Sequence, residues 1–222
     1  IRNQYSFHMK KKLLTLILTL KFLTFLVFKN NNLITQFYIY YFYFVFDKIK
    51  IIECPRDAMQ SIKTFIPTEI KLNYLQKLVT VGFDVIDIGS FVSNKAIPQL
   101  ADTPKIIESI DLSNSNSKLL VIVANKKGAI NASKYDKISF IGYPFSISEN
   151  FQIRNTNKSI KDSEKELEEI IKIAKQANKK VVVYLSMCFG NPYGDPWNIE
   201  IVNEWISRLV DMNVKIISLS DT

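Results

Sequence analysis

From residue 48 onward, short apolar runs rich in β-branched side chains alternate with longer stretches whose apolar residues recur at helical spacing. Runs of the first kind are typical of buried strands in a parallel sheet, and stretches of the second kind are typical of amphipathic helices. Strands are therefore predicted at KIKIIEC (48–54), DVIDIG (84–89), KLLVIVA (118–124), KISFIG (137–142), KVVVYLSM (180–187) and VKIISLS (214–220).

The stretches between these runs carry helix start and stop signals. Thr68, directly after Pro67, is predicted to cap the start of one helix, and Gly82 is predicted to end it. Ser163 and Glu166 stand in capping-box spacing in the longest charged stretch, whose apolar residues form one stripe. The chain therefore reads as an alternation of strands and helices, which is typical of a parallel α/β sheet.

Six near-consecutive βα units fit either a doubly wound sheet or part of a (β/α)8 barrel. No GxGxxG or GxxxxGK[ST] motif follows a predicted strand, so a dinucleotide site or a P-loop has no support. In a barrel, reactive residues should lie at the carboxyl ends of the strands. These ends are mostly polar, small or charged, and read ECPRD, DIGSF, VAN, IGYPFS, LSMCFGNPYGDP and SLSDT.

The first 46 residues have a different composition from the rest of the chain. The formal net charge is +8, but residues 1–50 hold eight basic side chains against one acidic one, so the remainder is nearly neutral and predicts no nucleic-acid partner. The segment 36–46 is almost entirely aromatic and apolar. Residues 1–46 are expected to lie outside the fold, as a membrane anchor or signal beginning at Met9, a genuine extension or translated upstream sequence. Residues 47–222 are expected to form the folded domain.

Two cysteines without CxxC spacing indicate neither a disulfide framework nor a structural zinc site, so a reducing, cytoplasmic location is expected. The single histidine, His8, lies in the N-terminal segment. No histidine is therefore available in the predicted domain to activate Cys188 as a nucleophile.

Taken together, the strand-end motifs resemble the 3-hydroxy-3-methylglutaryl-CoA (HMG-CoA) lyase family. That family belongs to a larger group of metal-dependent TIM-barrel enzymes that includes the isopropylmalate and homocitrate synthases. The Ser-Phe-Val-Ser stretch and the Pro-Gln pair in the second motif distinguish lyases from synthases. The resemblance implies an incomplete TIM (β/α)8 barrel, with about six βα units present and strands 7 and 8 missing. The matching motifs, in the family's order, are ECPRDAMQ (53–60), VIDIGSFVSNKAIPQLADT (85–103), NKKG (125–128), SENFQIRNTNKSI (148–160), YLSMCFGNPYGDP (184–196) and SLSDT (218–222).

The resemblance implies that the first of these motifs carries the central chemistry. The family's aspartate after the strand-1 arginine binds a divalent cation, Mg²⁺ or Mn²⁺, and maps to Asp57. The arginine, here Arg56, stabilises the enolate oxygen formed when the carbon–carbon bond breaks. A hard cation prefers carboxylate oxygen, and a fixed guanidinium complements a developing oxyanion. Gln60 would orient the loop or the substrate. The family's strand-2 acid is a glutamate, and here it is Asp87, one methylene shorter, with a role beside the metal or in proton handling.

Further positions match family residues that line the same mouth, namely Ser90, Asn125 and Asp221. The resemblance implies substrate binding for the first two and an acid/base or orienting role for the third. Each assignment has a structural alternative. Arg56 and Asp57 can form a surface ion pair that adds little stability, Asp87 can cap the next loop, and Asn125 can be a turn residue.

The resemblance implies a lyase that cleaves HMG-CoA to acetyl-CoA and acetoacetate, a reaction of leucine degradation, with an acyl-CoA substrate and a homo-oligomeric assembly. The family's other metal ligands are a His-x-His pair on strand 7 and a later asparagine, which this sequence does not contain, so the chain by itself is expected to be an inactive fragment. Two alternatives are a related 2-oxo-acid aldolase or synthase, such as an isopropylmalate synthase relative, and a non-catalytic protein associated with a membrane through residues 9–46.

Overall fold

Six parallel strands form one sheet in the order β1-β2-β3-β4-β5-β6. The computed structural model describes residues 49–221, so the predictions for residues 1–46 lie outside the described residues. The strands are β1 (Ile52–Glu53), β2 (Val85–Ser90), β3 (Lys118–Ile122), β4 (Ile138–Ser146), β5 (Lys180–Ser186) and β6 (Ile216–Leu219).

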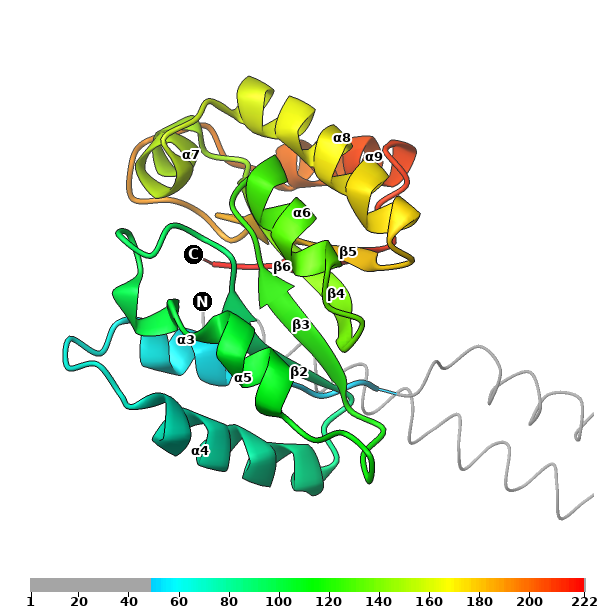
Figure 1. Cartoon of the computed structure of the whole chain (residues 1–222). Coiled ribbons are helices and arrows are strands. Elements are labelled where there is room, and N and C mark those ends of the chain that lie inside the picture. Colours follow the sequence, from blue (N-terminus) through cyan, green and yellow to red (C-terminus); the bar gives the residue numbers. More distant parts are fainter. Residues whose placement is uncertain (1–48, 222) are drawn as a thin grey trace, which may run out of the picture. The chain divides into compact units, whose positions relative to one another are not determined.

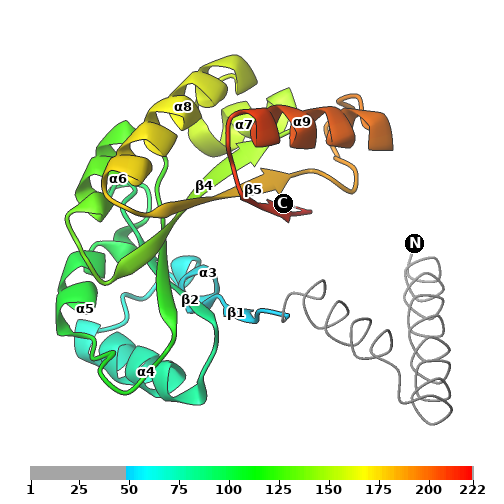
Figure 2. The same ribbon diagram turned by 90° about the vertical axis from the view of Figure 1, so that its right-hand side faces the viewer.

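Helices connect each strand to the next and cover the convex side of the curled sheet (Figures 1 and 2). A doubly wound sheet would carry helices on both faces, so the arrangement is that of a partial barrel, as the sequence resemblance implied. The helical elements are α3 (Pro55–Gln60), α4 (Thr68–Val81), the 3-10 turn η1 (Pro98–Leu100), α5 (Thr103–Ser109), α6 (Lys126–Ser133), α7 (Glu149–Thr156), α8 (Ile160–Gln176) and α9 (Ile199–Asp211).

The two faces of the sheet differ in how they are packed. Side chains such as Leu119 and Val121 of β3 join the large core beneath the helices, whereas Leu120 between them joins a small cluster on the concave face with Val85 and Val182. Successive residues of a strand point to opposite faces, so this division follows directly from the sequence. The strand sequences are continuously apolar because both faces of the sheet bury side chains.

The first strand and its following loop differ from the sequence prediction. The strand predicted over residues 48–54 contains only Ile52–Glu53, and the residues after Cys54 form helix α3. Pro55 occupies the first helical position, where its fixed φ and missing N–H are tolerated. Arg56 and Asp57 therefore project from a short helix rather than from a strand end.

Two predicted helix caps were wrong. Helix α8 is capped by Ser159, whose hydroxyl accepts a hydrogen bond from the backbone N–H of Asp162, and Ser163 is buried inside the helix. At α4 the cap position is Pro67, and Thr68 is the first helical residue without a side-chain cap. The predicted stop at Gly82 is confirmed, because this residue adopts a φ of 90°, which favours glycine.

Membrane association was one alternative for this chain. No helix in residues 49–221 is long and apolar enough to cross a membrane.

Candidate functional site

Arg56 connects the side chains of Asp57, Gln60 and Asp87 into one cluster. Its Nε and Nη2 atoms donate to Oδ2 of Asp87 at 3.0 and 2.7 Å. Its Nη1 atom donates to Oδ1 of Asp57 at 3.0 Å and to Oε1 of Gln60 at 2.9 Å. The amide of Gln60 also donates to Oδ1 of Asp57. Four of the seven residues that the sequence singled out therefore lie together, just past the carboxyl end of β1, where Asp87 of the neighbouring β2 meets them.

Local sequence explains half of this arrangement. Arg56 and Gln60 are four residues apart on α3, so their side chains share one helix face. Asp87 comes from β2, on the concave face of the sheet, and β2 pairs with β1 in parallel, so both strand ends reach the same edge. The Arg56 to Asp87 contact is therefore a tertiary contact between residues 31 positions apart.

Burial sets the electrostatics of Asp87. Its side chain is fully buried, whereas the side chain of Asp57 is 63% exposed. Burial raises the pKa of Asp87 to about 6, although the charge and hydrogen bonds of Arg56 act in the opposite direction. The Oδ1 atom of Asp87 has no hydrogen-bond partner among the described residues. Asp87 thus pairs with Arg56, and the alternative that it caps a loop is wrong.

The pKa of Asp87 predicts a specific pH dependence of folding. The pKa of Asp87 is 3.8 in an unperturbed chain and about 6 in the folded protein. Between these pH values Asp87 therefore carries a proton in the folded protein that it lacks in the unfolded chain. The stability that Asp87 contributes is therefore complete below about pH 4 and lost as the pH rises through about 6. We expect the difference in unfolding free energy between the wild type and Asp87→Asn to fall over this interval in urea titrations. A difference that grows with pH would contradict the assignment.

The other three predicted residues lie apart from this cluster. Asn125 accepts a hydrogen bond from the backbone N–H of Gly128 through Oδ1 and thereby caps the start of α6, where the structural alternative had been a turn residue. Asp221 follows β6, at the opposite edge of the sheet from β1, is exposed, and makes no hydrogen bond or ion pair with any described residue. Their roles toward a substrate stay predictions.

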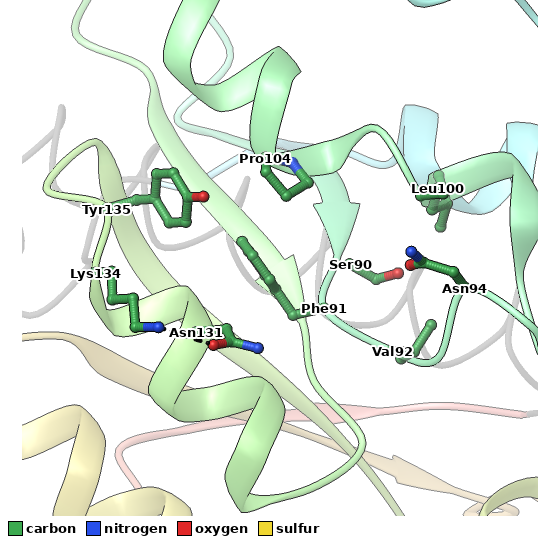
Figure 3. Close-up of a pocket in the computed structure, with 10 residues that line it drawn as sticks. Ser90, Phe91, Val92, Asn94, Leu100, Pro104, Asn131, Lys134 and Tyr135 are labelled. Carbon is green, nitrogen blue, oxygen red and sulfur yellow. Dashed lines mark hydrogen bonds between the residues drawn. The ribbon is translucent and has the colours of Figure 1, made fainter.

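Ser90 lies at the end of β2 and lines a cavity of about 260 Å³ (Figure 3). Its hydroxyl is buried and has no hydrogen-bond partner among the described residues. The rings of Phe91 and Tyr135 form part of the wall, with centroids 5.5 Å apart. The loop after β2, the end of η1, the start of α5 and the end of α6 complete the cavity, which shares Ser90 alone with the predicted site.

Tyr184 is a neighbour of the cluster that the sequence analysis missed. It lies on β5 and packs in the concave-face cluster with Val182. Burial and the negative charge of Asp87 raise the pKa of its phenol well above the usual value, so the two side chains interact electrostatically. A side chain at Gly142 would place Cβ 3.0 Å from the Tyr184 ring, so glycine makes room for it. The strand alternation would have placed Tyr184 on this face, but not beside Asp87.

The described residues do not form a metal site by themselves. Within residues 49–221, no group of three or more His, Cys, Asp or Glu side chains is arranged to hold a metal ion. Asp57 is an exposed carboxylate that offers one oxygen ligand, and a hard divalent cation takes about six. No step of the chemistry can therefore be derived from a metal bound by these residues alone.

Comparison with known proteins gives a consistent result. The HMGL-like family model matches residues 48–222. The human cytoplasmic HMG-CoA lyase is 34% identical over 177 residues, which cover 78% of this chain and 47% of that protein. The mitochondrial hydroxymethylglutaryl-CoA lyase of Bos taurus is 33% identical over 178 residues, which cover 79% of this chain and 54% of that protein.

Solved structures agree with the sequence comparison. The HMG-CoA lyase of Bacillus subtilis superposes with a TM-score of 0.74 at 33% identity, covering 79% of this chain and 58% of that one. An HMG-CoA lyase from Acinetobacter baumannii, solved with coenzyme A and 3-methylmalate, gives a TM-score of 0.72 at 26% identity and covers 78% and 56%. The chain spans about half the length of the curated relatives it matches. Since the family model covers most of the chain and the fold agrees with solved lyases, this chain belongs to the HMGL-like family.

Proposed function

We propose that this chain carries the Arg56 part of an HMG-CoA lyase site and acts on an acyl-CoA substrate. The observation that carries the proposal is the fixed guanidinium of Arg56, held by the buried Asp87 at the carboxyl edge of a partial barrel. Similarity to lyases at 33–34% identity, one related structure of which holds coenzyme A, supports the substrate class. A synthase relative is not favoured by these relatives.

The hydrogen bonds of Arg56 suggest what it does in the reaction. Cleavage of HMG-CoA removes the proton of the tertiary hydroxyl and releases the acetyl-CoA portion as an enolate, with acetoacetate as the other product. A guanidinium has five N–H groups, and four of those of Arg56 bind Asp87, Asp57 and Gln60. One N–H on Nη2 is left to donate to the enolate oxygen, and the position of this group is set before the substrate arrives.

The remaining predicted residues receive supporting roles in this proposal. Gln60 orients the side chains of Asp57 and Arg56 through its hydrogen bonds to both. Ser90 and Asn125 contact the substrate. Asp87 keeps Arg56 oriented, and its pKa of about 6 lets it take part in proton handling near neutral pH. Asp221, an exposed carboxylate, is the candidate acid or base.

The cofactor, assembly and location are also proposals. Asp57 would supply one oxygen ligand to Mg²⁺ or Mn²⁺, with the other ligands from outside the described residues. A homo-oligomer and a cytoplasmic location are proposed, and the relatives include both cytoplasmic and mitochondrial lyases.

Binding of HMG-CoA by the full 222-residue chain tests the proposed function. We expect calorimetric titration to give a measurable affinity that Arg56→Met weakens at least about tenfold, because a charge-assisted hydrogen bond to the substrate is lost. The matched control is Arg208→Met. Arg208 is partly exposed and forms an ion pair with Glu164, and neither residue belongs to the Arg56 cluster. Equal affinity in the two variants would contradict the proposal. Preferential binding of 2-oxoisovalerate instead would favour the synthase alternative.

A further inference from the structure

The side chain of Gln99 binds the backbone of the loop that follows α3. Its Nε2 atom donates to the carbonyl oxygens of Ile62 and Thr64, both at 2.9 Å. Its Oε1 atom accepts from the backbone N–H of Ile66 at 2.9 Å. Gln99 is 4% exposed, whereas its partners Ile62 and Thr64 are exposed, so the three hydrogen bonds are partly buried. One glutamine thereby fixes a loop that has no regular secondary structure.

Lys71 fixes in turn the segment that carries Gln99. Its ammonium group donates to the backbone carbonyl oxygen of Gln99 and to both carboxylate oxygens of Asp102, at 2.9 and 3.1 Å. The Lys71 side chain is fully buried, and its nitrogen lies 4.1 Å from the centroid of the Phe65 ring. A buried ammonium group without partners would be costly, and here all of its hydrogen bonds go to Gln99 and Asp102, in the same segment.

Helix α3 needs such support because it is short. It contains six residues, and the strand before it contains two. Helices of this length are not stable by their own hydrogen bonds, so tertiary contacts decide where α3 lies. The last backbone bond at its end joins the N–H of Ile62 to the carbonyl oxygen of Met59, directly beside the residues that Gln99 holds.

We infer that Gln99 is a positioning residue for Arg56. By holding residues 62–66, Gln99 sets the end of α3, and α3 in turn presents the guanidinium to Asp87. Lys71 and Asp102 keep Gln99 in place. Gln99 makes no hydrogen bond to Arg56, Asp57 or Asp87, so it acts through the backbone. The positioning of Arg56 by Gln99 is independent of the proposed function, and only the effect of Gln99 on the reaction rests on that function.

The position of Gln99 also gives a sequence motif a structural role. The Pro98-Gln99 pair was one of the features by which the sequence resembles lyases rather than synthases. In the structure this pair begins η1, and the Gln99 amide binds the α3 loop from there. The pair is therefore tied to the geometry of the Arg56 cluster without being part of it.

Hydrogen–deuterium exchange of the full chain tests the inference. Gln99→Met keeps the size of the side chain and removes its three hydrogen bonds. We expect the amides of residues 56–62 to exchange at least about tenfold faster at millisecond to second labelling times, because α3 loses its support. Amides of β3, β4 and α8 are expected to keep their rates. Unchanged exchange in residues 56–62 would overturn the inference.

A matched control separates local positioning from general stability. Gln152 is also a buried glutamine, whose amide donates to the hydroxyls of Thr156 and Ser163 near α7 and α8. Gln152→Met is expected to leave exchange in residues 56–62 unchanged. Equal acceleration of these amides in both variants would reduce the role of Gln99 to global stability and overturn the inference. Asp102→Asn, a milder change that weakens the hold of Lys71, is expected to accelerate the same amides to a smaller extent.

Titration with HMG-CoA keeps this inference separate from the proposed function. If Gln99→Met accelerates exchange in residues 56–62 but the wild-type chain does not bind HMG-CoA, the positioning role stands and the proposed function fails. If the wild type binds HMG-CoA and the exchange is unchanged in Gln99→Met, the inference fails and the proposed function stands.

Discussion

Arg56→Met is expected to lower the free energy of unfolding by about 3 to 5 kcal/mol at neutral pH, the range found when one partner of a buried ion pair is removed. Asp87 is fully buried, and Arg56 supplies both of the hydrogen bonds to its Oδ2 atom. Without the guanidinium, Asp87 must either stay charged in a poorly solvated site or take up a proton. Urea unfolding followed by circular dichroism measures this loss.

Two comparisons identify the cause of that loss. The double variant Arg56→Met, Asp87→Asn is expected to be more stable than Arg56→Met alone, because it no longer buries an unpaired charge. Arg208→Met breaks a partly exposed ion pair with Glu164 and is expected to cost less than about 1 kcal/mol. If Arg56→Met lowers the free energy of unfolding no more than Arg208→Met does, burial of the Asp87 carboxylate does not depend on its pairing with Arg56.

Phe145→Ala is expected to destabilise the protein by about 3 to 5 kcal/mol, as large-to-small changes of buried aromatic residues do. Phe145 lies on β4, is 1% exposed, and meets the ring of Trp205 on α9 edge to face at 5.1 Å. Its removal leaves a cavity between the sheet and the helix layer that the neighbouring elements cannot fill. The midpoint and slope of urea unfolding give the change in free energy.

The same strand offers a matched control for this variant. Phe140 lies on β4 as well, but it packs only in part against the small concave-face cluster with Leu120 and Val182. Phe140→Ala is therefore expected to cost clearly less than Phe145→Ala, since less apolar area returns to water. Equal losses would mean that the concave face contributes as much to stability as the helix-covered face.

Several features of the site could not be predicted because they depend on contacts between distant segments. The motif ECPRDAMQ indicated that Arg56 and Asp57 would lie at the end of the first strand, but its proline starts a helix there. Asn125 illustrates the opposite case. Its capping contact with Gly128 is local, three residues along the chain, although the sequence analysis had offered only a turn residue there. Local signals therefore predicted local hydrogen bonds unevenly, because the caps expected at Thr68 and Ser163 were wrong, and they predicted the cluster only in outline.

The sequence by itself determined the alternation of strands and helices, the division of each strand into two faces and the motifs that point to the Arg56 region. These properties are carried within each element, as periodicity and composition. Only the tertiary structure decided that Arg56 pairs with Asp87, that Tyr184 lies near that pair, and that Gln99 holds the loop after α3. The physical reason is that these contacts join residues about 30 or more positions apart, whose approach depends on the curvature and register of the assembled sheet.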